Sequence, residues 1–390
     1  MDITKILFLS HYGANHQFQD FFSEIGNRPG FEVKVVLPKE VQYTNGYQPQ
    51  YFLERKTINN VEYIPGKLFR KKTYLLSGYF PALPLAIMQH NPDIIIVTDE
   101  TFTFDTFFVV LYKLLFFKRY RIVTWSQAKY FEDSSYLPWP VRILLKFNKL
   151  FAHRFVARNH GQEERIKKAL PIGNKVKTVY WSSDPAQFKP LNLSSAKLVK
   201  KLKQEIIFDQ KYILGFVGRV VPEKGVLNII QALADLPEHV SFVVAGDGNE
   251  EYIMKCKKYI TEHKLEKRCF MLGAQDYDRL VYLYNIIDLL ILPTNKGKRD
   301  FYELFGRVLV EAMMTKTLIL GSNNGAIPEV VGDDRFIFQQ GNQQSMIEKI
   351  LFCLNLDDTE RTKILESNYL RSQQKFTIKA FADNLLELSE

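Results

Sequence analysis

The feature that most constrains this fold is a series of short apolar runs, rich in β-branched residues, that alternate with amphipathic segments. In the first half of the chain these runs occupy residues 6–9, 32–38, 93–97, 121–125 and 154–157. Continuously apolar runs indicate strands that are buried on both faces. Their alternation with helical segments, the first of which carries Phe18, Phe21, Phe22 and Ile25, favours a parallel sheet covered by helices on both sides.

The same alternation begins again in the second half of the chain. Strands are predicted at residues 212–217, 240–245, 288–293 and 317–320, with a helix over 225–236 after the first of them. A chain of 390 residues is too long for one ordinary core and suits two domains. The sequence therefore predicts two Rossmann-like doubly wound domains, over residues 1–190 and 191–374, that face each other across a cleft.

Composition excludes several classes of protein. The three cysteines, Cys256, Cys269 and Cys353, lack CxxC spacing, which disfavours a disulfide framework or a zinc site and favours a reducing compartment. Residues 1–10 do not form a signal peptide, and no apolar stretch reaches the roughly 20 residues of a membrane-spanning helix. We expect a cytoplasmic protein, free or peripheral on the inner face of the cell membrane. Its net charge of +9 suits phosphorylated ligands, anionic lipid or nucleic acid.

Charged residues follow the strand at 212–217. Gly218 permits a tight turn, and Arg219 and Lys224 bracket the turn that leads to the next helix. Two cations beside a helix N-terminus are suited to holding a diphosphate. The competing interpretation is a pair of solvated charges on a loop.

A second candidate segment runs from Glu303 to Glu311. Gly306 precedes an apolar helix, whose first N–H groups can bind a phosphate. Glu311 lies among apolar residues of that helix, and a buried carboxylate requires partners, which ribose or sugar hydroxyls can supply. Glycine-containing turns at 245–248 and 321–329 are weaker signals of close backbone approach to a ligand.

Together these motifs resemble the retaining glycosyltransferases of family GT4, which have the GT-B fold. The pattern Gly-Arg-x4-Lys-Gly, Gly-Asp-Gly, Glu-x7-Glu and Gly-x-x-Pro-Glu keeps its order and spacing over residues 213–332. Residues 183–190 are similar to the family's interdomain motif. The segment 375–390 is similar to its closing helix, which returns to the N-terminal domain.

The resemblance implies a role for each matching residue. Arg219, Lys224 and Glu303 would be catalytic, the two cations on the donor diphosphate and Glu303 on the donor sugar. Glu311 would bind the ribose and Leu272 would lie beside the base. The remaining donor-binding residues would be Gly13, Gly218, Gly246, Leu304, Phe305, Gly306 and Arg307. The nucleotide sugar, UDP- or GDP-linked, would be a co-substrate, and no separate cofactor is expected.

The sequence departs from the family pattern at three places. The loop after the first strand reads His11-Tyr12-Gly13-Ala14, so only Gly13 matches the family's paired glycines. Residues 124–127 contain no histidine, so no catalytic histidine is expected there. The loop at 294–302 is longer than usual, and we interpret it as a solvated loop or a lid.

The family mechanism is attack on the same face of the sugar, with the leaving diphosphate assisting deprotonation of the acceptor. The protein then contributes positioning and charge stabilisation. Asp276-Tyr277-Asp278 is a DxD sequence, but it opens a predicted helix, and helix capping explains it better than metal binding. We therefore expect a metal-independent hexosyltransferase.

The acceptor should bind the N-terminal domain and is expected to be lipid-linked or a saccharide. Basic and aromatic residues gather at 67–80 and 139–155, and such elements can lie on an anionic membrane. The alternatives are transfer to a soluble small molecule, or a non-catalytic protein that binds nucleotide sugar or nucleic acid. No nucleic-acid-binding signature supports the last alternative, and no G-x-G-x-x-G supports a dehydrogenase.

Overall fold

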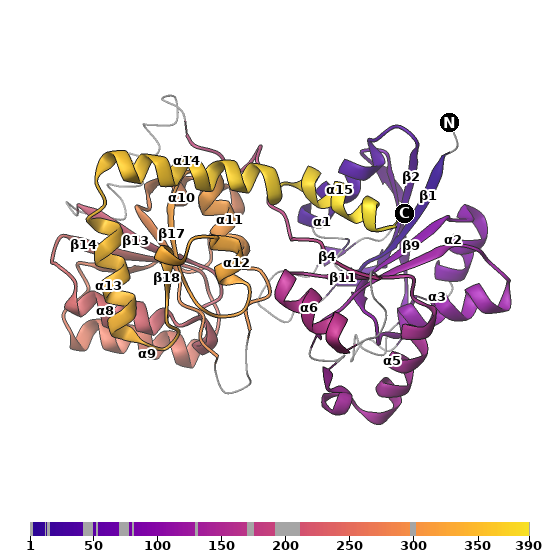
Figure 1. Ribbon diagram of the computed structural model, residues 1–390, viewed down its shortest axis with the longest axis horizontal. Helices are drawn as coiled ribbons and strands as arrows, with labels where there is room; N and C mark the ends of the chain where they lie inside the picture. Colours follow the sequence, from indigo (N-terminus) through magenta and orange to yellow (C-terminus); the bar gives the residue numbers. More distant parts are fainter. Residues whose placement is uncertain are drawn as a thin grey trace. The chain divides into compact units, whose positions relative to one another are not determined.

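The computed structural model describes residues 3–11, 13, 16–41, 50–51, 54–69, 78–79, 82–128, 132–169, 175–191, 211–296 and 302–389. The chain divides into two compact units (Figure 1). The first consists of Met1–Tyr180 together with Ile378–Glu390, and the second of Trp181–Thr377. Residues 192–210 lie outside the described residues.

The first unit is built around an eight-stranded sheet in the order β12-β11-β10-β9-β1-β2-β6-β5. Its strands are β1 (Thr4–Leu9), β2 (Phe31–Pro38), β5 (Lys56–Ile58), β6 (Val61–Gly66), β9 (Ile94–Glu100), β10 (Arg121–Trp125), β11 (Arg154–Ala157) and β12 (Val176–Thr178). All neighbours pair in parallel except β5 and β6. Two short antiparallel pairs accompany the sheet: β3 (Glu40–Val41) with β4 (Gln50–Tyr51), and β7 (Leu68–Phe69) with β8 (Gly78–Tyr79).

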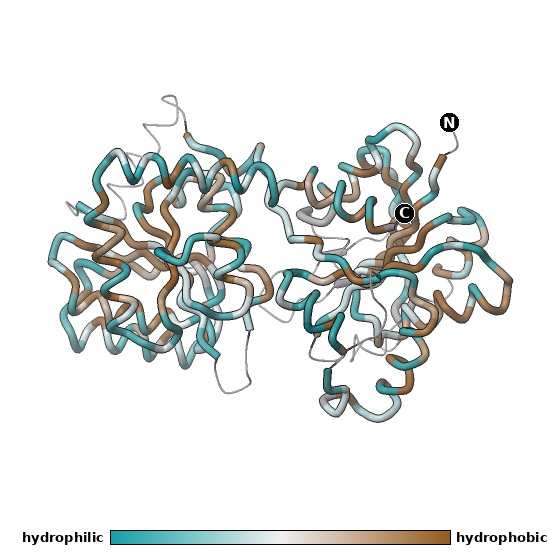
Figure 2. The backbone as a smooth tube through the Cα atoms, viewed as in Figure 1, coloured by the Kyte–Doolittle hydropathy of each residue, from teal (hydrophilic) through white to brown (hydrophobic). Residues whose placement is uncertain are grey.

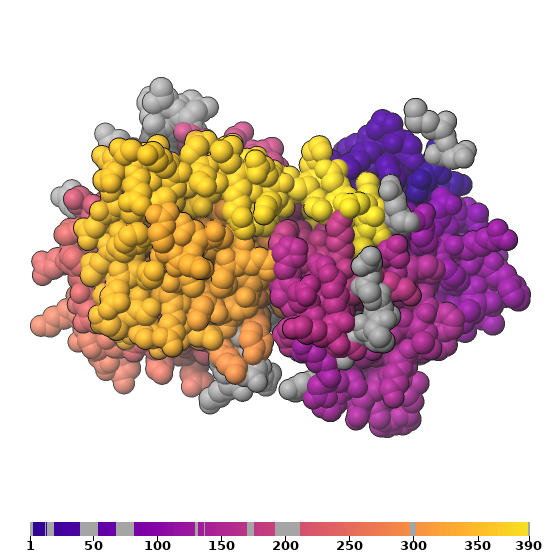
Figure 3. Space-filling model, viewed as in Figure 1, coloured from indigo at the N-terminus to yellow at the C-terminus, as the bar shows by residue number. Residues whose placement is uncertain are grey.

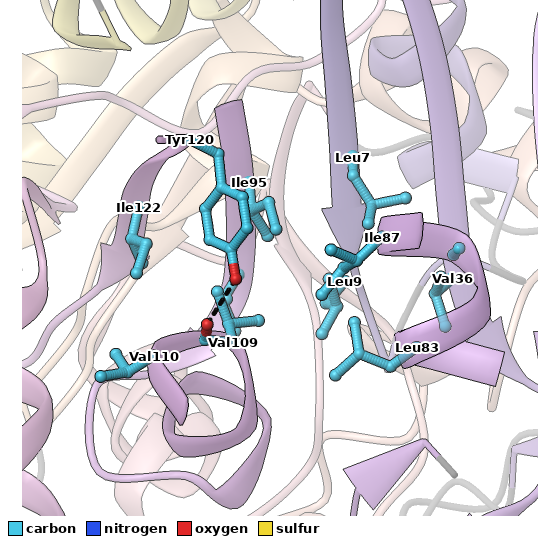
Figure 4. Close-up of a cluster of buried hydrophobic side chains, with 12 residues drawn as sticks. Leu7, Leu9, Val36, Leu83, Ile87, Ile95, Val109, Val110, Tyr120 and Ile122 are labelled. Carbon is cyan, nitrogen blue, oxygen red and sulfur yellow. Dashed lines mark hydrogen bonds between the residues drawn. The ribbon is translucent and has the colours of Figure 1, made fainter. Parts of the chain in front are cut away.

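Helices cover both faces of this sheet, as the continuous apolar runs predicted. They are α1 (His16–Gly26), α2 (Ala82–His90), α3 (Phe104–Leu115), α5 (Trp139–Phe151), α6 (His160–Ala169) and α15 (Ile378–Ser389). Side chains alternate along β1, so Leu7 and Leu9 enter the core beneath α2 and α3 (Figure 4). Phe8 instead packs against Phe22 of α1, with ring centroids 4.9 Å apart.

The helix α15 belongs to the first unit although it follows the whole of the second unit in sequence. Its Phe381 is buried against Phe21 of α1, with ring centroids 4.9 Å apart. Asp383 accepts a hydrogen bond of 2.6 Å from Arg28, which lies just after α1. The predicted return of the C-terminal helix to the N-terminal domain is therefore confirmed.

The second unit contains a six-stranded, wholly parallel sheet in the order β15-β14-β13-β16-β17-β18. Its strands are β13 (Tyr212–Val217), β14 (Val240–Ala245), β15 (Cys269–Met271), β16 (Leu289–Leu292), β17 (Leu318–Ser322) and β18 (Ile337–Phe338). Its helices are α8 (Val226–Asp235), α9 (Glu250–Glu262), α10 (Tyr277–Ile286), α11 (Arg307–Met314), α12 (Ile327–Val331), α13 (Gln343–Leu354) and α14 (Asp358–Lys375). The helix α14 lies at the surface of this unit (Figure 3).

The apolar residues concentrate on the strands in the interior of each unit, as the hydropathy colouring shows (Figure 2). The two predicted parallel-sheet α/β domains are thus confirmed. No helix among the described residues has both the length and the apolar character needed to span a membrane. Of the loop at 294–302, only residues 294–296 and 302 are described, and of the segment 67–80 only 67–69 and 78–79.

Candidate functional site

Three loops meet at the carboxyl edge of the second unit, because they follow the neighbouring strands β13, β16 and β17. The amide of Asn295, after β16, donates to the carbonyl of Glu223, after β13, at 2.8 Å. The hydroxyl of Ser322, at the end of β17, donates to the carbonyl of Thr294 at 2.6 Å. Parallel strands present such loops at one edge, where open α/β folds bind ligands.

Lys224 and Glu303 come together at this edge, although 79 residues separate them. The Lys224 ammonium donates a hydrogen bond to Oε2 of Glu303, and the hydroxyl of Thr294 donates to the same oxygen at 3.2 Å. The two side chains are only 14% and 11% exposed. Hydrogen bonds between charged groups are among the stronger ones, so this pair is well positioned before any ligand binds.

Gly218 and Gly246 allow the loops after β13 and β14 to touch. A Cβ atom on Gly246 would lie 1.8 Å from the carbonyl oxygen of Gly218, and both residues have positive φ, at 143° and 153°. The amide of Val220 also donates to the carbonyl of Asp247 at 2.9 Å. This contact fixes the turn that carries Arg219, whose side chain is exposed and forms no ion pair with another described residue.

Glu311 faces the neighbouring helix α10. It is 2% exposed, and Oε2 accepts a hydrogen bond of 2.6 Å from Tyr284. Oε1 accepts a longer one of 3.4 Å from Tyr277 and lies 3.2 Å from Nε of Arg307. Burial raises the pKa of Glu311 although Arg307 and the two tyrosines act in the opposite direction. The carboxylate is therefore costly to ionise, and its partners offset only part of that cost.

The segment before Glu311 begins α11 without a side-chain cap. Gly306 occupies the N-cap position with φ of 84° and, because it has no side chain, supplies no cap hydrogen bond. The first N–H groups of a helix lack intrahelical acceptors, and such groups can bind an anion. Phe305 is buried against Phe376, with ring centroids 5.5 Å apart, which holds the segment Leu304–Phe305 in place.

Leu272 lies after β15, at the edge of the same sheet. Its amide donates to the carbonyl of Val244 at 2.9 Å, and its carbonyl accepts a bond of 2.8 Å from the Gln275 side chain. Gly13, the remaining predicted site residue, lies in the first unit after β1, with its amide 3.3 Å from the carbonyl of Ser10.

The partners of Glu311 were not anticipated from sequence. Tyr277 and Tyr284 are seven residues apart, so they lie on one face of α10, and Phe188 packs edge-on against both rings at 5.1 and 5.8 Å. The spacing of the two tyrosines is the signal that could have indicated a shared partner. Asp276 occupies the N-cap of α10 as expected, but its side chain does not form the cap hydrogen bond.

Comparisons with known proteins identify the fold. The whole chain is similar to Anabaena HepE in complex with UDP and glucose, at 20% identity and a TM-score of 0.70 over 98% of both chains. It is also similar to the lipopolysaccharide outer core galactosyltransferase WaaB, at 14% identity and a TM-score of 0.67 over 99% of both chains. The fold is therefore GT-B. Residues 199–370 match the family described as "Glycosyl transferases group 1", so the resemblance to GT4 that the motifs indicated is confirmed over this part of the chain.

Two curated relatives match parts of the chain. The capsular polysaccharide biosynthesis glycosyltransferase CapM of Staphylococcus aureus is 23% identical over 62% of this chain. The lipopolysaccharide 1,2-N-acetylglucosaminetransferase of Salmonella typhimurium is 31% identical over 42% of it. The matches span 60% and 45% of the lengths of these relatives.

Replacing Glu311 by Gln should increase the melting temperature at neutral pH. The folded protein holds Glu311 with a raised pKa, so the wild type loses stability as the pH rises above the ordinary value of 4.5 and the buried carboxyl ionises. The amide avoids that cost while keeping an acceptor for Tyr284. The difference between the two melting temperatures should close as the pH falls toward 4.5. A Gln variant less stable than wild type at neutral pH would contradict this interpretation.

Proposed function

We propose that this protein is a retaining glycosyltransferase that moves a hexosyl group from a nucleotide diphospho-sugar to a lipid-linked or saccharide acceptor. The transfer would contribute to the assembly of cell-surface polysaccharide or a related glycoconjugate. The observation that carries the proposal is the partly buried pair of Lys224 and Glu303 at the carboxyl edge of three neighbouring strands. The similarity to CapM, a capsular polysaccharide biosynthesis glycosyltransferase, and to the lipopolysaccharide transferase of Salmonella supports the same class of product.

In this proposal Lys224 and Arg219 stabilise the leaving diphosphate. Charge accumulates on the diphosphate as its bond to the sugar breaks, and fixed cations that face this charge lower the barrier. The exposed Arg219 guanidinium is held on a turn that the Gly246 contact makes rigid. The 3-10 helix Pro222–Lys224 and its bond to the loop after β16 position Lys224.

Glu303 is assigned to the hydroxyls of the donor sugar. A carboxylate can accept two hydroxyl hydrogen bonds at once, and Thr294 and Lys224 occupy only Oε2 in the hydrogen bonds of the described structure. When a donor binds, Lys224 would share its three donor hydrogens between Glu303 and phosphate oxygens. This exchange keeps the charge of the pair balanced during the reaction.

Glu311 is assigned to the ribose. The 3.4 Å contact from Tyr277 is the weakest of its hydrogen bonds, so a ribose hydroxyl can replace it at Oε1 while Tyr284 stays on Oε2. A UDP-linked sugar is the first donor to test, because HepE is similar in fold and holds UDP with glucose. A GDP-linked sugar is the second. Because Arg219 and Lys224 are assigned to the charge of the diphosphate, this proposal requires no metal.

The first unit would bind the acceptor and contact an anionic membrane through α5. Trp139, Ile143 and Leu150 project from its outer face at helical spacing, and Leu150 is 75% exposed. Arg142 and Lys146 lie exposed on the same helix, which has no acidic residue. Apolar side chains beside basic ones suit the boundary between lipid headgroups and acyl chains.

The end of α3 adds a second apolar element, which the sequence did not single out as a contact. Leu115, Phe116 and Phe117 are exposed at its C-terminus, Phe117 by 91%, and α3 packs against α5. Arg119 is exposed beside them, and residues 106–128 contain no Asp or Glu. Exposed phenylalanines flanked by a cation favour a lipid surface over water.

Two alternatives remain distinct from this proposal. A transferase acting on a soluble acceptor would need neither apolar element and would be fully active without lipid. A non-catalytic protein that binds nucleotide sugar or nucleic acid would have no use for the Lys224–Glu303 pair, and its turnover would be zero with any donor.

Nucleotide sugars should raise the melting temperature in a thermal-shift screen of UDP, GDP and ADP sugars, and the best binder should be hydrolysed slowly. The first sugar released should keep its anomeric configuration, which proton NMR can follow, and EDTA should not slow hydrolysis. Absence of any stabilisation would exclude the transferase, and an inverted sugar would exclude retention.

Lys224→Ala and Arg219→Ala should each lower kcat by about 10²–10³-fold, because each removes one fixed donor to the developing charge. The matched control is Lys257→Ala on the exposed face of α9, which should have wild-type kcat and melting temperature. If both variants turn over at the wild-type rate while remaining folded, the assignment of the two cations is wrong.

Flotation with vesicles of phosphatidylcholine, with and without phosphatidylglycerol, should show binding only to the anionic vesicles at low salt. Phe117→Ser or Leu150→Ser should weaken binding by about tenfold or more, since burying one large apolar side chain contributes about 1.5–3 kcal/mol. Met254→Ser, which removes an exposed apolar side chain from α9 of the second unit, is the control and should bind as wild type. Equal flotation of all variants would contradict these elements as the contact.

A further inference from the structure

A buried histidine lies between two buried carboxylates at the carboxyl edge of the first unit's sheet. His11 follows β1, Asp99 lies near the end of β9, and Asp105 is in the first turn of α3. Nδ1 of His11 is 2.6 Å from Oδ2 of Asp99 and 3.7 Å from Oδ2 of Asp105. The ring is therefore oriented with Nδ1 toward both carboxylates and Nε2 on its far side.

The connection between β9 and α3 is rigid, so this cluster is positioned in advance. The amide of Thr101 donates to the carbonyl of Trp125 at 3.1 Å, and its hydroxyl shares a 2.7 Å bond with Ser126. The buried side chain of Asn148, on α5, donates to the carbonyl of Thr101 at 2.7 Å. A site held by such supporting bonds keeps its geometry when a ligand arrives.

Stability alone does not account for this cluster. Three ionisable groups lose most of their hydration here, and apolar residues of similar volume usually stabilise such a position as well or better. The cluster also lies at the edge where strands of an open parallel sheet present their ligand-binding loops. A costly polar group at that edge is a candidate contact to a ligand.

We propose that His11, held by Asp99 and Asp105, donates a hydrogen bond from Nε2 to a hydroxyl oxygen of the acceptor. The inference rests on the proposed function, because it takes the hydroxyl-bearing ligand of the first unit to be the acceptor of the sugar. His11 would be a binding contact that orients the hydroxyl, and no proton transfer is assigned to it.

The protonation state of His11 suits a donor. Burial opposes the positive charge, but the charge and hydrogen bond of Asp99 and the charge of Asp105 outweigh it and raise the pKa to about 9. At neutral pH the ring is therefore an imidazolium with a hydrogen on both nitrogens. The stability that this raised pKa contributes is fully present below the ordinary value of 6.5 and is lost as the pH rises through about 9, where the ring gives up one hydrogen.

A divalent cation is the competing occupant. The three ligand atoms of His11, Asp99 and Asp105 lie within 4.8 Å of one another, the one such group of His, Cys, Asp and Glu found among the described residues. A cation would displace the Nδ1 hydrogen and would compete with the hydrogen bond to Asp99. The two occupants therefore predict opposite responses of the ring to added metal.

The test follows the His11 ring by NMR in protein labelled at histidine, with the signal assigned from His11→Gln. The probes are the octyl glycosides of glucose, galactose and N-acetylglucosamine, added in the presence of UDP. At least one probe should shift the His11 signal, and the shift should fade as the pH rises from about 8 to about 10. This pH range begins above the pKa of Glu100, which burial raises to about 7. His153, whose pKa burial lowers to about 4, provides an internal reference that should not move.

Transfer assays with the probe that binds separate this inference from the proposed function. His11→Gln and Asp99→Asn should raise KM for the probe by about tenfold, the loss of one charge-assisted hydrogen bond, and leave the affinity for UDP unchanged. His160→Gln, which replaces an exposed histidine of the same unit, is the matched control.

Three results would overturn the inference. The first is that no probe moves the His11 signal, and the second is that a folded His11→Gln variant keeps the wild-type KM. The third is stoichiometric broadening of the His11 signal by Mn²⁺, which would assign the cluster to a cation. Failure of the proposed function gives a different result, because the protein would then bind no UDP and hydrolyse no nucleotide sugar.

Discussion

The backbone contact between Gly325 and Glu303 holds the second unit's site together. A Cβ atom on Gly325 would lie 2.2 Å from the carbonyl oxygen of Glu303, and that oxygen accepts a 2.9 Å bond from the amide of Ala326. The amide of Glu303 donates to Oδ1 of Asn324 at 2.8 Å. Both peptide groups of Glu303 are thus fixed by the turn after β17, so the side chain meets Lys224 without depending on the course of the long loop before it.

Both units bury charge where an apolar side chain would be less costly. Glu311 is enclosed by two tyrosines and an arginine in the second unit, and His11 by two aspartates in the first. The tyrosines come from α10, and Asp99 and Asp105 come from β9 and α3, so these contacts to Glu311 and His11 form only in the folded unit. This pattern is typical of ligand sites, which keep destabilising polar groups because these groups are already oriented when the ligand binds.

Much of this fold could be predicted because the buried strands are continuous apolar runs. The runs at 6–9, 93–97 and 240–245 are strands at those positions, and Gly306 does begin a helix. The three-residue edge strand β5 and the two-residue edge strand β18 were not predicted, since strands this short carry too few residues for a periodic signal. The six-residue strand β6, which pairs with β5, was not predicted either.

The site was partly predictable for a different reason. Residues that follow neighbouring strands meet at one edge, so Lys224 and Glu303 could be grouped from the order of elements alone. The contacts of Glu311 with Tyr277 and Tyr284, and of His11 with Asp99 and Asp105, depend on how helices pack and on side-chain orientation. The seven-residue spacing of the tyrosines puts them on one face of a helix, but it does not identify the residue that this face contacts. Nothing in the sequence indicates that His11 and Asp99, which are 88 positions apart, are in contact.

The placement of α15 in the first unit has a consequence for how the chain is made. The ribosome synthesises the first 180 residues early, yet the helix that covers Phe21 and Trp125 emerges only after all of Trp181–Thr377. The second unit is continuous in sequence, so its sheet can close as it leaves the ribosome. The first unit must meanwhile expose part of the apolar surface of α1, which makes it the more aggregation-prone of the two units during synthesis.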